Sequence, residues 1–181
     1  TRKLFSYVPQ GNMLISGTIK DNITFINPDA SDTEIEKAIR ISCAKQFIDE
    51  LPLGLETVIG EKGLGLSEGQ VQRLAIARAI AKDPKIFIFD DSFSALDLKT
   101  DAALRKALAE NVKDSTVIIV AQRISTILHA EQILVLDDGK IVGKGTHEEL
   151  LKSCEVYRQI AKSQLSAKEL GLEESEVALN E

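Results

Sequence analysis

Two adjacent carboxylates follow an apolar run near the middle of the chain. Residues 86–89 read IFIF, and Asp90 and Asp91 come directly after them. A fully apolar run of this kind is typical of a strand buried on both faces of a parallel sheet. A carboxylate at the end of such a strand points into the usual ligand crevice of the sheet, where paired carboxylates most often meet a metal ion. Aspartate in this position also starts turns and caps helices, so the pattern alone leaves a structural interpretation open.

A second candidate site is the segment LSEGQ at residues 66–70. Ser67 and Gln70 have the spacing of a capping box, which predicts that a helix begins here. Gly69 and the glycine-rich approach leave the N–H groups of the first turn open, and an open helix N-terminus attracts anions such as phosphate. The Ser67 hydroxyl would add a further donor. The alternative is a well-capped helix with no ligand.

The elements that must position these residues alternate between strands and helices. We expect strands at 4–9, 85–90 and 116–121, the last two apolar and buried, and helices within 27–54 and at 71–83 and 100–114. Ser31 and Glu34 form another capping box. This order predicts an α/β fold with a parallel core, in which residues 28–81 are an inserted helical subdomain.

The remainder of the chain is expected to be a hairpin, two helices and a tail. Asp138-Gly139 predicts the turn of a hairpin over 132–145. Helices are expected at 147–152 and 154–165, and the acidic residues 168–181 are expected to fray.

Composition limits the function classes. The chain has 181 residues and a formal net charge of -6, which disfavours a nucleic-acid backbone as the main partner. Cys43 and Cys154 lack metal-type spacing and are expected to be free thiols. The apolar runs are far shorter than the roughly 18 residues that a membrane-spanning helix needs.

Several segments resemble the motifs of ATP-binding cassette (ABC) transporter nucleotide-binding domains, in the order in which that family has them. The resemblance covers residues 5–165. The matching segments are YVPQ (7–10, with the Q-loop glutamine Gln10), TVIGEKG (57–63, a loop that touches the transmembrane domain in exporters), LSEGQ (66–70, the signature), IFIFD (86–90, Walker B), SALD (94–97, the D-loop), AQRISTI (121–127, the switch) and DDGKIVGKGTHEEL (137–150, the end of the domain).

The resemblance implies a P-loop NTPase (RecA-like) core, with ATP and Mg²⁺ as cofactors. Asp90 would bind Mg²⁺, and Gln10 would contact Mg²⁺ or the attacking water. The signature residues Ser67, Gly69 and Gln70 would bind ATP held by a second ABC subunit. Asp97 would act across the same interface.

Two residues depart from the family pattern at the positions that carry the chemistry. Asp91 stands where the family usually has the glutamate that acts as general base, and it is shorter by one C–C bond, roughly 1.5 Å. Gln122 stands where the family has the switch histidine; it can donate a hydrogen bond but cannot carry a proton as histidine does. Together they predict weak hydrolysis at this chain's own site. Neutral drift in an active enzyme is the alternative.

A third departure is the absence of a G-x-x-x-x-G-K-[ST] segment, so the chain has no Walker A loop to hold phosphates. We therefore interpret it as a fragment that lacks Walker A and an upstream transmembrane domain. Its predicted parts are residues 1–27 (Q-loop strand and start of the helical subdomain), 28–81 (helical subdomain with the signature), 82–152 (RecA-like core) and 153–181 (C-terminal helix and acidic tail).

The resulting hypothesis is the degenerate half of a heterodimeric, multidrug-type exporter at the cytoplasmic face of a membrane. In this hypothesis the chain lends its signature to the partner's site. One rival is a regulatory half that binds ATP without hydrolysing it, which Asp91 and Gln122 favour. The other is a soluble DNA-repair or chromosome ATPase, for which the chain lacks basic surfaces and coiled-coil insertions.

Overall fold

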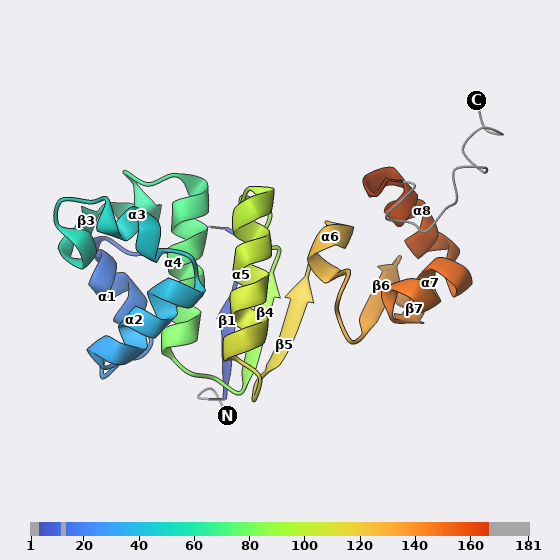
Figure 1. Ribbon diagram of the computed structural model, residues 1–181, viewed down its shortest axis with the longest axis horizontal. Helices are drawn as coiled ribbons and strands as arrows, with labels where there is room; N and C mark the ends of the chain where they lie inside the picture. Colours follow the sequence, from blue (N-terminus) through green and yellow to red (C-terminus); the bar gives the residue numbers. More distant parts are fainter. Residues whose placement is uncertain (1–3, 12–13, 167–181) are drawn as a thin grey trace. The chain divides into compact units, whose positions relative to one another are not determined.

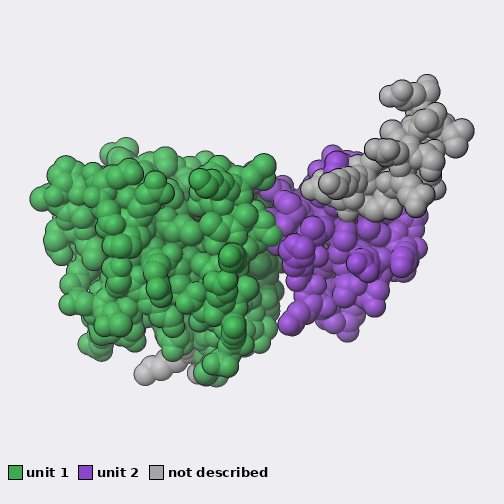
Figure 2. Space-filling view, in the orientation of Figure 1, with its two compact units in different colours: residues 1–121 green, residues 122–181 purple. Residues whose placement is uncertain are grey.

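The computed structural model describes residues 4–11 and 14–166, in two compact units. The first unit is Thr1–Ala121 and the second is Gln122–Glu181 (Figures 1 and 2). The expected fraying of residues 168–181 lies outside the described residues. No helix in the described part of the chain is long and apolar enough to cross a bilayer.

A parallel sheet organises the first unit. Its strands are β1 (Phe5–Val8), β4 (Ile86–Asp90) and β5 (Thr116–Val120), in the order β1-β4-β5. Val8 pairs with Phe89, and Phe89 pairs with Ile119, so the carboxyl ends of all three strands meet at one edge. The α/β fold with a parallel core is therefore confirmed.

One face of the sheet is covered by two long helices, α4 (Glu68–Ala81) and α5 (Leu98–Asn111) (Figure 1). Phe87 and Phe89 project from β4 into the same buried cluster as Leu74 of α4 and Leu104 of α5. All four side chains are at most 2% exposed. This cluster holds β4, and thus the carboxylates that follow it, against the helices.

The opposite face of the sheet is open among the described residues. The expectation that residues 116–121 form a buried strand is wrong, because Ile118 is 48% exposed and Val120 is 54% exposed. The physical reason is position: β5 pairs only with β4 in the described part of the chain, and no described element packs over the face that carries these two side chains. β4 is likewise buried on one face only, since Ile86 and Ile88 are half-buried.

Between β1 and β4 the chain forms a helical region. Its elements are β2 (Gly17–Thr18), α1 (Ile19–Thr24), α2 (Asp32–Ile41), α3 (Lys45–Asp49), the 3-10 turns Gly54–Glu56 and Glu61–Gly63, β3 (Val58–Ile59) and then α4. The capping boxes predicted at Ser31 and Ser67 are both present. α4 begins at Glu68, directly after its N-cap Ser67, so the helix includes the three residues before the expected range 71–83.

The second unit contains α6 (Ile124–Ile127), β6 (Ile133–Asp137), β7 (Lys140–Gly145), α7 (His147–Ser153) and α8 (Glu155–Gln164). β6 and β7 form the expected antiparallel hairpin, and Asp138 and Gly139 both have positive φ at its turn. Leu150 and Tyr157, from α7 and α8, are central to its small core.

A network of hydrogen bonds around the buried Asn22 connects α1 to the signature helix α4. Asn22 is fully buried; its amide oxygen accepts from the Ile15 N–H at 2.9 Å and from Arg78 Nη2 at 2.7 Å, and its amide nitrogen donates to the Thr18 carbonyl at 3.0 Å. Arg78 Nε also donates to the Asn22 carbonyl at 2.7 Å, and its guanidinium lies over the Phe25 ring. Burial lowers the pKa of Arg78, so these acceptors compensate a desolvated charge.

Replacing Asn22 by alanine should lower the free energy of unfolding by about 3 kcal/mol, because it removes the acceptor of a charged donor and the acceptor of the part-buried Ile15 N–H. Urea unfolding followed by far-UV circular dichroism measures this. The matched control is Asn111→Ala, which removes an exposed amide that donates to the Ala107 carbonyl at 2.8 Å. It should change the free energy by at most about 0.5 kcal/mol. Equal effects of the two substitutions would contradict the prediction.

Candidate functional site

The carboxyl ends of β1 and β4 bring one group of predicted site residues together. Tyr7 Oη donates to Asp90 Oδ2 at 2.8 Å, and Gln10 Nε2 donates to Asp91 Oδ2 at 3.4 Å. Gln10 is 80 and 81 residues from the two aspartates in sequence, and the parallel pairing of β1 with β4 makes them neighbours. The hydrogen bond to the Asp90 carboxylate raises the pKa of the Tyr7 phenol.

The backbone at Asp91 is fixed by its surroundings. Its N–H donates to the Val120 carbonyl at 2.9 Å, and its carbonyl accepts from Ser94 Oγ at 2.9 Å. The buried Ser92 hydroxyl donates to the Val8 carbonyl at 2.9 Å and so ties the loop to β1. Asp91 itself has φ 48°, a left-handed conformation that aspartate adopts more readily than most residues. Its short side chain therefore suits the local backbone.

The donor set of this group fits a hard divalent cation. Asp90 and Asp91 supply carboxylate oxygens, and Gln10 keeps its amide oxygen as an acceptor while its nitrogen bonds Asp91. Among the described residues there is no cluster of three or more histidine, cysteine or acidic side chains that could enclose a metal. Mg²⁺ is usually held by one or two carboxylates together with substrate phosphates, so a site with two carboxylates suits it.

The other predicted residues of the first unit gather where α4 begins. Ser67 Oγ accepts from the Gln70 N–H at 3.3 Å, and Gln70 Oε1 accepts from the Ser67 N–H at 2.8 Å. A Cβ on Gly69 would lie 3.2 Å from the Ala95 carbonyl oxygen, so glycine permits α4 to approach the SALD loop closely. Gln72 Oε1 holds that loop by accepting from the Ala95 N–H at 3.2 Å.

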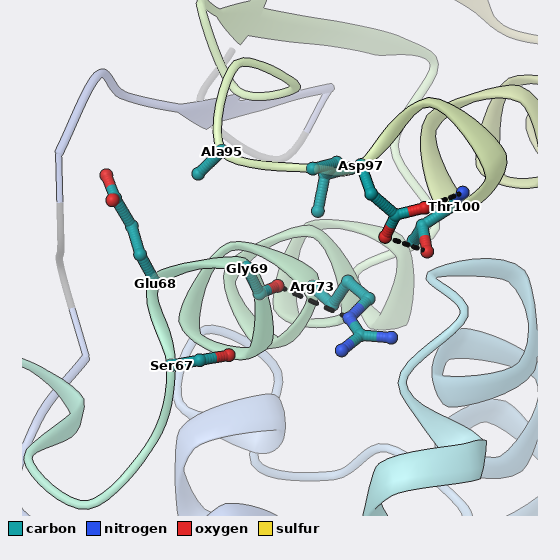
Figure 3. A pocket seen from close by; sticks show the side chains of 8 residues that line it. Ser67, Glu68, Gly69, Arg73, Ala95, Asp97 and Thr100 are labelled. Carbon is teal, nitrogen blue, oxygen red and sulfur yellow. Dashed lines mark hydrogen bonds between the residues drawn. The ribbon is translucent and has the colours of Figure 1, made fainter.

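A cavity of about 370 Å³ lies at this junction (Figure 3). It is lined by Ser67, Glu68, Gly69, Arg73, Ala95, Leu96, Asp97 and Thr100. Arg73 donates from Nε to the Gly69 carbonyl at 3.3 Å and from Nη1 to the Cys43 carbonyl at 3.1 Å, with its guanidinium over the Phe47 ring. Burial lowers the pKa of Arg73. The open first turn of α4 and this half-buried cation offer donors to an anion, while Glu68 and Asp97 bring negative charge to the same lining.

Asp97 faces the same cavity but is also the N-cap of α5. Its carboxylate accepts from the Lys99 and Thr100 N–H groups at 3.1 and 3.0 Å and from Thr100 Oγ1 at 2.7 Å. These hydrogen bonds, above all those from Thr100, lower the pKa of Asp97. The carboxylate is thus ionised and held at the start of the helix.

Gln122 belongs to the second unit. Its carbonyl accepts from Gln164 Nε2 at 2.8 Å, which anchors the start of that unit to α8. The structure thus brings Gln10, Asp90 and Asp91 together in one group, and Ser67, Gly69, Gln70 and Asp97 in another. It describes Gln122 only within its own unit.

Sequence reasoning missed the contribution of Tyr7. The alternation of side chains along a strand could have indicated this contact, because it places Tyr7 of β1 and Asp90 of β4 on the same face of the sheet. Using it required the register Tyr7↔Ile88, which places Asp90 one diagonal step along the same face.

Comparison with known proteins identifies the family. A family model described as "ABC transporter" matches residues 1–94, a little over half of the chain. The chain is 46% identical over 171 residues to "Probable multidrug resistance ABC transporter ATP-binding/permease protein YheI" of Bacillus subtilis, covering 94% of this chain and 29% of that protein. It is 42% identical over 167 residues to "ABC transporter B family member 1" of Dictyostelium discoideum, covering 92% of this chain and 18% of that protein.

A solved structure of the same family has a similar fold. The structure of a bacterial Atm1-family ABC exporter with ATP bound has a TM-score of 0.87 and 36% identity to this chain, covering 91% of this chain and 29% of that one. The chain thus spans less than a third of the length of each of these relatives. With a parallel sheet that ends in Asp90 and Asp91, a capped LSEGQ helix and these matches, the chain belongs to the ABC transporter family and carries part of its P-loop NTPase fold.

Proposed function

We propose that this chain is the ATP-binding part of an ABC exporter, which binds Mg·ATP at a dimer interface and couples it to export across a membrane. The observation that carries the proposal is the group at the ends of β1 and β4, where Gln10 contacts Asp91 and Asp90 lies beside it. The names of relatives support it, since YheI is described as an ATP-binding/permease protein. In this proposal the chain works at the cytoplasmic face, joined to a transmembrane domain.

Within this function Asp90 and the Gln10 amide oxygen are the residues that would hold Mg²⁺. When bound, the ion supplies positive charge that neutralises the phosphate oxygens. Gln10 donates to Asp91 through its nitrogen, so it also orients the carboxylate that would receive a proton from the attacking water.

Asp91 is the residue that limits hydrolysis in this proposal. A general base must come within about 2.6–3.2 Å of its proton donor, and a displacement of about 1 Å can cost on the order of 100-fold in rate. The aspartate falls short of a glutamate by roughly one C–C bond. Gln122 lowers the expected hydrolysis rate further, because an amide cannot take up a proton as the histidine of the family can.

The cavity at the start of α4 has a different role. Its N–H groups, the Ser67 hydroxyl and Arg73 suit a phosphate group presented by a second ABC subunit, whose own site this chain would complete. We propose a heterodimer in which this chain holds a weak site and lends an intact signature to its partner.

The second candidate is a regulatory half that binds ATP without hydrolysing it. Asp91 favours it through its short reach and its left-handed backbone, which suits aspartate better than a longer side chain. Transport would then depend on the partner's hydrolysis alone.

The first test disables the partner. In the full-length exporter with its partner, the partner's catalytic glutamate is changed to glutamine and ATP turnover is measured. We expect turnover to fall to background, because Asp91 and Gln122 support little hydrolysis. Survival of about half of the turnover would show that Asp91 is a working base and would overturn the weak-site proposal.

The second test lengthens the base. With the partner's site disabled, Asp91→Glu together with Gln122→His should raise turnover by about 3- to 20-fold. A glutamate at φ 48° costs about 1–2 kcal/mol in backbone energy, less than the roughly 2.7 kcal/mol that a 100-fold rate gain represents. Asp91→Asn, which suits the same backbone but has no basic carboxylate, is the matched control and should stay at background. Equal rates for the two would contradict the assignment of Asp91.

The third test separates capping from nucleotide contact. Ser31 and Ser67 form the same capping box, at α2 and α4 respectively. Changing either to alanine should cost about 1 kcal/mol of stability. Only Ser67→Ala should also weaken ATP-dependent association with the partner, measured by cross-linking of the two subunits. If Ser31→Ala weakens association equally, the effect is one of stability and Ser67 has no role in binding.

A further inference from the structure

The hydroxyl group of Tyr7 contacts the Asp90 carboxylate because both side chains lie on the same face of the sheet. Tyr7 pairs with Ile88, and Asp90 lies two residues further along β4, so both side chains project from the open face of the sheet. The phenol oxygen donates to Asp90 Oδ2 at 2.8 Å. The ring is 52% exposed, so the side chain is not part of the packed core and the hydroxyl contact is its main specific interaction in the described part of the chain.

This hydrogen bond restricts the carboxylate in two ways. It occupies one oxygen of Asp90 and selects one side-chain rotamer, which leaves the second oxygen free to face a ligand. A charge-assisted hydrogen bond is also stronger than one between neutral groups, so it holds that rotamer effectively. Partners that hydrogen-bond to metal-binding carboxylates typically change metal affinity when they are removed.

We propose that Tyr7 is a positioning residue for magnesium: its hydroxyl holds the Asp90 carboxylate in the orientation that binds the Mg²⁺ of Mg·ATP. The inference rests on the proposed function, because it requires that Asp90 meets Mg·ATP. It adds a residue that acts through Asp90 and touches neither nucleotide nor metal.

The test measures how much Mg²⁺ improves ATP binding, without turnover. The full-length exporter is photolabelled on ice with 8-azido-ATP, label on this chain is resolved from label on the partner, and ATP competition gives the affinity in Mg²⁺ and in excess EDTA. The ratio of the two affinities is the coupling between metal and nucleotide. Tyr7→Phe should reduce this ratio about 10-fold and leave the affinity in EDTA unchanged.

Two variants make the result specific. Tyr157→Phe is the matched control, since it removes the other tyrosine hydroxyl, which bonds His147 Nδ1 at 2.8 Å in the second unit, and it should leave the ratio unchanged. In an Asp90→Asn background, adding Tyr7→Phe should have no further effect, because Tyr7 acts through the Asp90 carboxylate.

The outcomes separate the inference from the proposed function. An unchanged ratio in Tyr7→Phe, or an equal loss in Tyr7→Phe and Tyr157→Phe, overturns the positioning role. A loss of affinity in EDTA as well as in Mg²⁺ also overturns it, because the effect would then be one of structure. If this chain takes no label in wild type under either condition, the proposed ATP-binding function itself fails.

Discussion

The parallel pairing of β1 with β4 is the constraint on which the rest of the structure depends. It places Val8 beside Phe89, and so the chain that leaves β1 meets the chain that leaves β4 at one edge of the sheet. Gln10 reaches Asp91 and Tyr7 reaches Asp90 only because of this register. A shift by one residue would turn Tyr7 to the helix-covered face and separate it from Asp90. The buried Phe87 and Phe89 hold β4 in that register by packing under α4 and α5.

The signature helix is connected to the same strand through its packing. Leu74 of α4 lies in the cluster that contains Phe87 and Phe89, and Gln72 accepts a hydrogen bond from the loop that follows β4. Gly69 allows α4 and this loop to approach closely. The loop that follows β4 joins Asp90 and Asp91 to Asp97 and the cavity at the start of α4 within a few residues. In the proposed function, this loop is a short mechanical connection between the chain's own site and the site that it would complete in a partner.

Aspartate at position 91 has a structural reason as well as a chemical consequence. The left-handed backbone there is held by hydrogen bonds to Val120 and Ser94, and aspartate adopts it with less strain than a longer side chain. In the proposed function, an aspartate at this position also has a shorter reach than a glutamate. The backbone preference and the proposed weak hydrolysis thus concern the same residue.

The sequence by itself determined several local elements and indicated the family. Apolar β4 with its terminal carboxylates, the capping boxes at Ser31 and Ser67 and the hairpin turn at Asp138-Gly139 are local patterns, whose physical cause lies within a few residues of chain, and the structure has all of them. Tertiary structure decided the rest. The Tyr7–Asp90 hydrogen bond and the contact of Arg73 with the Cys43 carbonyl join residues far apart in sequence. The exposure of Ile118 depends on which element covers a sheet face, and an apolar strand has the same sequence whether or not another element packs against it.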